Sequence, residues 1–167
     1  MRRAWWIGFA VVAFACDAGP PAKPIDACSV LTQSVANSFF GNTAVEQPSG
    51  GAECVWSYEA ADHTKWSLQL RLHDLTTARV PDIVVTKPTI TIDGVPEPDA
   101  PIVEDLLVGT KRGSLDASNS DGVAVHWRHD ARYFVHLKLT GPAAAGPASK
   151  IEVMKQLAAT IEAALPR

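Results

Sequence analysis

The fold is decided by residues 123–139, which read VAVHWR (123–128), HDA (129–131) and RYFVHLKL (132–139). Apolar and polar side chains alternate on either side of the three central residues, as in two half-buried strands joined by a tight turn. The apolar face of this predicted hairpin consists of Val123, Val125, Trp127, Tyr133, Val135, Leu137 and Leu139. The stretch therefore predicts two antiparallel strands that lie with one face on a hydrophobic core.

Other segments have the composition of strands. CVWSY (54–58) and WSLQLRLH (66–73) alternate in the same way, and residues 60–64 between them have the length of a hairpin loop. Residues 110–115 predict a further strand, and residues 89–92 predict a short one. We therefore expect an antiparallel sheet.

A helix is predicted over residues 32–40. Thr32 is suited to cap its first turn, and Gly41 can adopt the left-handed conformation that ends it. Between them, Val35 and Phe39 recur at helical spacing.

A second helix is predicted at the C-terminal end. Ser149 and Glu152 have the spacing of a capping box. The apolar stripe that follows consists of Ile151, Met154, Leu157, Ala158, Ile161 and Leu165. The expected fold is therefore α+β: a single domain in which the N-terminal and C-terminal helices pack on one face of an antiparallel sheet.

Residues 1–15 have the pattern of a signal peptide. Arg2 and Arg3 supply the positive charge, residues 4–14 the apolar core, and Ala15 the small residue before a cut. The apolar run is too short for a membrane-spanning helix, which needs about 20 residues.

Ala13-Phe14-Ala15-Cys16 resembles the lipobox of bacterial lipoproteins. The resemblance implies that Cys16 carries a diacylglycerol thioether and further fatty acyl chains such as palmitate, which would hold the protein on a membrane. The alternative is ordinary cleavage, with Cys16 removed or left as a free thiol. Lipidation is favoured because the chain has three cysteines, and a thioether at Cys16 leaves Cys28 and Cys54 as a pair.

Lipidation would place the protein in the bacterial cell envelope, anchored to a membrane and facing the periplasm or the exterior. Residues 16–25 are rich in proline and poor in apolar groups, so they are expected to form a flexible tether between the lipid and the domain. The folded domain is then expected over residues 26–167.

The charge of the chain argues against a nucleic-acid partner. There are 15 Lys and Arg residues against 18 Asp and Glu residues, a formal net charge of −3. Loss of Arg2 and Arg3 with the signal peptide would leave 13 basic residues and a charge of −5. A nucleic-acid-binding domain needs a basic face, which this sequence does not supply.

Residues 26–32 read DACSVLT and precede a helical pattern that ends at Gly41, a Gly-rich loop and CVW at residues 54–56. This order resembles a family of small secreted bacterial lipoproteins of the actinobacterial type, which have a Cys-x-Leu-Leu-Thr helix start and a Cys-x-Trp strand. The resemblance implies a disulfide between Cys28 and Cys54. It implies no catalytic residues, because the family has no agreed activity.

The expected compartment independently supports the same cysteine pair. Exported proteins meet oxidising conditions, and closing a loop of about 25 residues stabilises a fold by roughly 3.5 kcal/mol. A redox pair or a metal site is the weaker alternative, because the sequence has no Cys-x-x-Cys motif and no His/Cys cluster around these positions.

Three histidines are candidates for a site. With a turn at residues 129–131, His126 would lie opposite Phe134 and diagonal to His136 on the outward face of the sheet. His73 could join them there. The favoured interpretation is a row of solvated polar positions, and the alternative is a zinc site; we expect no metal and no cofactor.

The sequence predicts an envelope binding or interaction module without catalytic activity. Its expected partners are the membrane, reached through the lipid, and an envelope protein or a small apolar ligand. The candidate contact residues are His126, His136 and Phe134, the last as an exposed aromatic side chain. The alternative function is a small metal-dependent hydrolase that uses the histidine cluster.

Overall fold

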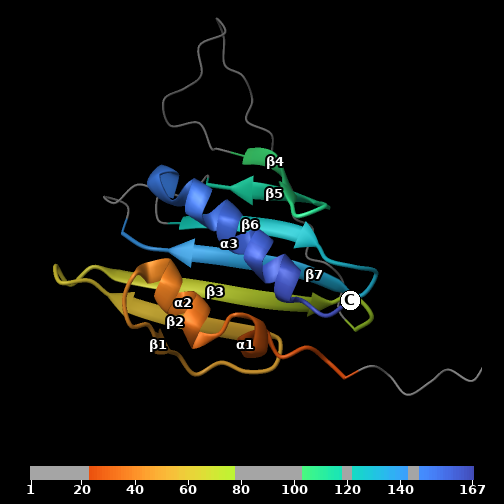
Figure 1. Cartoon of the computed structure of the whole chain (residues 1–167), viewed down its shortest axis with the longest axis horizontal. Helices are drawn as coiled ribbons and strands as arrows, with labels where there is room; N and C mark the ends of the chain where they lie inside the picture. Colours follow the sequence, from red (N-terminus) through yellow and green to blue (C-terminus); the bar gives the residue numbers. More distant parts are fainter. Residues whose placement is uncertain (1–22, 78–102, 118–121, 143–146) are drawn as a thin grey trace, which may run out of the picture.

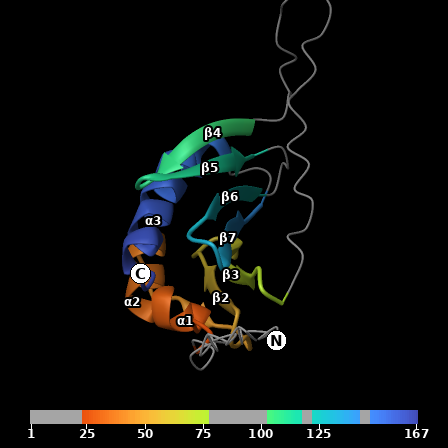
Figure 2. The same cartoon turned by 90° about the vertical axis from the view of Figure 1, so that its right-hand side faces the viewer.

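The computed structural model describes residues 23–77, 103–117, 122–142 and 147–167. These residues form one curved antiparallel sheet with helices on one of its faces (Figures 1 and 2). The predicted α+β class, with an N-terminal and a C-terminal helix on the same face, is confirmed. The predicted signal peptide, Cys16 and the strand expected at residues 89–92 lie outside the described residues.

The sheet has seven strands. They are β1 (Val45–Glu46), β2 (Glu53–Glu59), β3 (Lys65–Asp74), β4 (Val103–Val108), β5 (Lys111–Asp116), β6 (Gly122–Arg128) and β7 (Tyr133–Thr140). Their order across the sheet is β1-β2-β3-β7-β6-β5-β4, and all neighbours are antiparallel. The predicted hairpin of β6 and β7 therefore supplies the centre of the sheet, and β7 joins it to the earlier hairpin of β2 and β3.

The register of the β6–β7 hairpin differs from the prediction. His126 pairs with His136, and Arg128 pairs with Phe134. The turn lies one residue later than expected because the Asp130 side chain accepts hydrogen bonds from the backbone N–H groups of Arg132 and Tyr133, both at 2.7 Å. A shift of two residues in pairing leaves every side chain on its predicted face.

The N-terminal helical region consists of α1 (Ala27–Val30) and α2 (Gln33–Phe40). Thr32 Oγ1 accepts a hydrogen bond from the Val35 N–H, and Gly41 ends α2 with φ = 70°, so both predicted ends are confirmed. The short helix α1 was not predicted; Asp26 caps it by accepting from the Cys28 N–H at 3.0 Å.

The predicted capping box of the C-terminal helix is wrong. A 3₁₀ turn, η2 (Pro147–Lys150), contains Ser149 and leads directly into α3 (Ile151–Ala164). Lys150 therefore occupies the N-cap position, and its side chain makes no capping hydrogen bond. The predicted apolar stripe is confirmed, since its buried members are Met154, Leu157, Ala158, Ile161 and Leu165.

A disulfide and a hydrogen bond attach the N-terminal helices to β2. Cys28 and Cys54 are bonded, as predicted. Next to this bond, the buried Trp56 side chain donates from Nε1 to the Leu31 carbonyl at 2.7 Å. No helix among the described residues is both long and apolar enough to cross a membrane.

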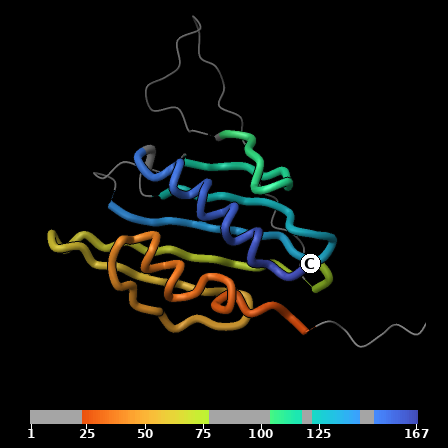
Figure 3. The backbone as a smooth tube through the Cα atoms, viewed as in Figure 1, coloured from red at the N-terminus to blue at the C-terminus, as the bar shows by residue number. Residues whose placement is uncertain are grey.

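A buried polar network attaches the end of α3 to the sheet. Glu162 Oε2 accepts from Trp127 Nε1 at 2.7 Å and lies 2.9 Å from His129 Nδ1. His129 Nε2 lies 2.9 Å from the Pro166 carbonyl oxygen. Both ring nitrogens of His129 thus lie within hydrogen-bond distance of an oxygen atom. Accordingly, the C-terminus lies beside the β6–β7 turn, where Figure 3 marks it.

Candidate functional site

The structure brings the predicted histidines together on the sheet face opposite to the core side chains of β3, β6 and β7. No described helix covers that face (Figure 2). The ring centroids of His126 and His136 are 4.5 Å apart. Phe134 lies between two histidine rings, 6.3 Å from His126 and 6.2 Å from His73. We call His73, His126, Phe134 and His136 the histidine row.

Phe134 is not the exposed aromatic side chain that the sequence predicted. It is half-buried between its two histidine neighbours, and His126 is only 9% exposed. His126 Nδ1 and His136 Nε2 are buried and have no hydrogen-bond partner among the described residues. The row is therefore a packed group of rings rather than an open docking surface.

Burial lowers the pKa of each histidine in the row and so favours its neutral form. Burial first, and the nearby His126 second, lower the pKa of His136 to about 4. Burial also lowers the pKa of His126, although the carboxylate of Asp116 acts in the opposite direction. The pKa of His73 is lowered by burial first and by Arg71 second.

Neutral imidazoles can bind metals, but the geometry of the row does not form a metal site. Among the residues that the structure describes, no group of three or more His, Cys, Asp or Glu side chains is arranged to hold an ion. A zinc site needs three or four such ligands in a tetrahedral arrangement.

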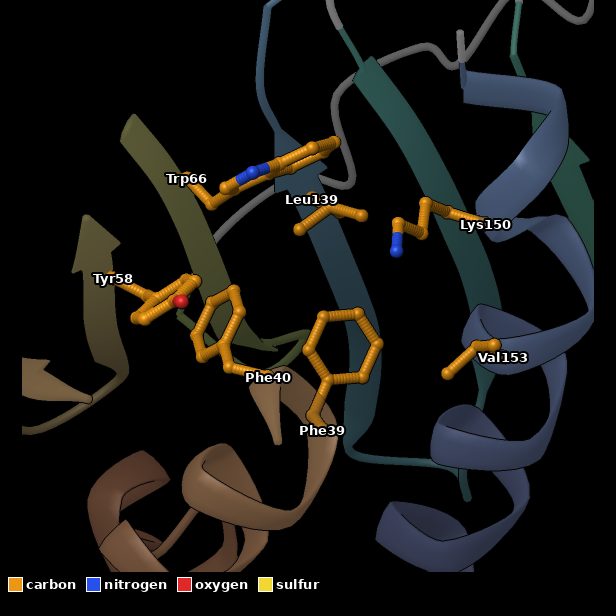
Figure 4. A pocket seen from close by; sticks show the side chains of 7 residues that line it. All are labelled: Phe39, Phe40, Tyr58, Trp66, Leu139, Lys150 and Val153. Atoms are coloured by element: carbon orange, nitrogen blue, oxygen red, sulfur yellow. The ribbon is translucent and has the colours of Figure 1, made fainter. Parts of the chain in front are cut away.

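A second site lies on the opposite face of the sheet, between α2 and the start of α3 (Figure 4). It is a partly open cavity of about 110 Å³. The residues that line it are Phe39, Phe40, Tyr58, Trp66, Leu139, Lys150 and Val153. We call it the aromatic pocket.

The pocket walls are held by aromatic packing. The Phe40 ring lies 5.2 Å from Phe39, edge to face, and 5.4 Å from Tyr58. Tyr58 pairs directly with Trp66 across the β2–β3 hairpin, so the hairpin itself places these two rings side by side. The Tyr58 hydroxyl is fixed by a hydrogen bond from Asn42 Nδ2 at 3.1 Å.

Gly141 permits the position of the Trp66 indole. A Cβ atom at Gly141 would overlap three carbon atoms of that ring. The indole therefore lies against the backbone just after β7, and Figure 4 shows it at one end of the pocket. The Lys150 Nζ lies 5.5 Å from the centroid of the Trp66 ring, within the range of a cation–π contact.

Most of these aromatic residues belong to segments that the sequence predicts correctly. The sequence assigns them separately, however, to the apolar side of a helix and to the faces of two strands. The pairing of Tyr58 with Trp66 follows from the predicted hairpin loop. The contribution of Phe39 and Phe40 to the pocket could not be predicted in this way, because the helical pattern shows only that one side of α2 is apolar. Whether that side meets a neighbour or borders a gap depends on tertiary packing.

Comparisons of this chain with family models, with curated proteins and with solved structures each find no match.

Proposed function

We propose that this protein is an exported binding module of the bacterial cell envelope, anchored through lipid at Cys16, that takes up a small apolar ligand in the aromatic pocket. The observation that carries the proposal is the pocket itself: four aromatic rings and two aliphatic side chains surround a cavity that is open to solvent. Small-molecule sites have this character, with apolar walls and a few polar groups.

The size of the pocket fits one ring. An engineered apolar cavity of roughly 150 Å³ binds benzene, and this cavity is slightly smaller but open on one side. Its walls come from α2, β2, β3, β7, η2 and α3, so a ligand would contact both helical regions. The proposal assigns no catalytic step to the protein.

The pocket is tested by ligand-observed NMR with toluene and the purified full-length protein. We expect saturation transfer to toluene, and its loss in the variant Val153→Trp. Val153 is 40% exposed at the pocket mouth, so an indole there can fill the cavity without entering the core.

The matched control is Val45→Trp, because Val45 is 61% exposed on the edge strand β1 and does not line the pocket. This variant should bind toluene as the parent protein does. Absence of binding to the parent, or equal binding by Val153→Trp, would refute the proposed site.

The anchor is tested separately by the intact mass of the native protein extracted from membranes. We expect the mass of a diacylglycerol adduct on Cys16, together with the loss of two hydrogens from the Cys28–Cys54 bond. In the variant Cys16→Ala the protein should leave the membrane fraction. A cleaved product without lipid would refute the anchoring and the lipoprotein assignment, and would leave the pocket untouched.

A further inference from the structure

The aromatic pocket contains one cation whose position needs an explanation. Lys150 stands at the N-cap of α3, a helix of 14 residues. The N-terminus of a helix carries partial positive charge, so carboxylates are favoured there and ammonium groups are not. Local electrostatics alone would therefore not select lysine at this position.

Lys150 also lacks an anionic partner among the described residues. Lys155, on the same helix, contacts the carboxylates of Glu104 and Glu152, both at 3.1 Å. For Lys150, no carboxylate of the described residues lies within ion-pair distance. Its ammonium group instead makes a cation–π contact with the Trp66 ring. Its side chain is half-buried and extends from the start of α3 into the pocket (Figure 4).

The remaining polar groups in the lining are few. The Tyr58 hydroxyl already accepts from Asn42, and the Trp66 indole N–H is the other uncharged donor. A sugar would leave most of its hydroxyl groups facing hydrocarbon, where unpaired polar groups are unfavourable. A flat ring with one anionic substituent fits both the apolar walls and the single ammonium group.

Building on the proposed function, we infer that the ligand is a small aromatic carboxylate, whose ring lies among Phe39, Phe40 and Trp66 and whose carboxylate pairs with Lys150. The carboxylate supplies a counter-charge for Lys150, whose ammonium has no carboxylate within ion-pair distance among the described residues. In a half-buried site this contact is a charge-assisted hydrogen bond, which is shorter and stronger than one between neutral groups.

The test compares three ligands of nearly the same shape: benzoate, benzamide and benzamidine, which carry charges of −1, 0 and +1 at pH 7.5. Their dissociation constants are measured by NMR titration of the purified full-length protein. We expect benzoate to bind at least about 10-fold more tightly than benzamide, and benzamidine to bind most weakly.

Three variants locate the charge effect. Lys150→Met keeps the apolar stem and should abolish the preference for benzoate, whereas Lys150→Arg should retain it. The control Lys65→Met removes an 80% exposed ammonium outside the pocket and should leave the preference unchanged.

The outcomes separate the two proposals. Equal binding of all three ligands, blocked by Val153→Trp, would keep the pocket and overturn the inference about charge. A benzoate preference that survives in Lys150→Met would overturn the role of Lys150. If neither these ligands nor toluene bind, the proposed function fails, and the inference fails with it.

Discussion

Because of the histidine row, we expect the free energy of unfolding to decrease between pH 7 and pH 5. In the unfolded chain a histidine takes up its proton near pH 6.5, whereas burial and the neighbouring His126 hold the pKa of His136 at about 4 in the folded protein. As the pH falls, the unfolded state therefore binds a proton that the folded state does not, and the free energy of unfolding decreases. The decrease begins near pH 7 and ends below pH 4.

The magnitude follows from the pH range. At pH 5, protonation of the unfolded imidazole alone corresponds to about 2 kcal/mol, since each pH unit below 6.5 contributes about 1.4 kcal/mol. Solvent reaches part of the His136 side chain, and this screening reduces the expected effect to about 1 kcal/mol. The pKa of His126 is also lowered, so His126 decreases the free energy of unfolding further as the pH falls.

Acidic groups contribute little to this window. The pKa of Asp74 is held at about 2 by Arg132 and Thr76, so its stabilising effect is lost only as the pH falls below about 4. Measurements between pH 7.5 and 5.0 therefore report mainly on histidines.

The assay is urea unfolding at pH 7.5 and pH 5.0, followed by circular dichroism. For His136→Gln, which keeps polarity but cannot be protonated, we expect the loss of stability between the two pH values to be smaller than in the parent by about 1 kcal/mol. The control is His63→Gln, because His63 is 89% exposed and lies in the loop between β2 and β3, away from the row. An identical pH dependence in His136→Gln and the parent would refute the reasoning.

Two other predictions concern the attachments of the helices. Replacement of Cys28 and Cys54 by serine should lower the free energy of unfolding by roughly 3.5 kcal/mol; reduction of the parent protein should have the same effect in urea unfolding, and an unchanged midpoint would contradict a structural disulfide. Glu162→Gln should lower the stability by roughly 3 kcal/mol, because it removes the buried carboxylate that His129 and Trp127 share. The control Glu152→Gln changes a largely exposed carboxylate in the first turn of α3 and should alter the unfolding temperature little; equal effects of the two changes would contradict the network.

The alternating segments made the strands and their faces predictable. The period of two assigned His126, Phe134 and His136 to one side correctly, even though the pairing was shifted by two residues. The shift could not be foreseen from hydrophobicity, because it depends on the hydrogen bonds of the Asp130 side chain. Strand β4 was missed because VEDLLV (103–108) does not alternate.

The aromatic pocket could not be predicted for a different reason. Pattern analysis finds which side of a helix is apolar, but it cannot say whether two helices on the same sheet touch. Here α2 contacts β2, whereas α3 contacts β6 and β4. Since β7 and β3 stand between β2 and β6 in the sheet, the two helices cover different halves of it (Figure 1).

The pocket is therefore a consequence of strand order. Trp66 lies on β3 and Leu139 on β7, two adjacent strands near the middle of the sheet. Both side chains face the space between the helices, as Figure 4 shows. A ligand there would contact Phe39 of α2 and Val153 of α3 at once, and its binding energy would add to the packing between the two halves of the sheet. Because β7 carries Leu139 toward the pocket and His136 toward the opposite face, ligand binding and acid destabilisation arise on different sides of one strand. A bound ligand should therefore raise the free energy of unfolding by a similar amount at pH 7.5 and at pH 5.0, for any ligand whose charge and affinity are the same at both pH values.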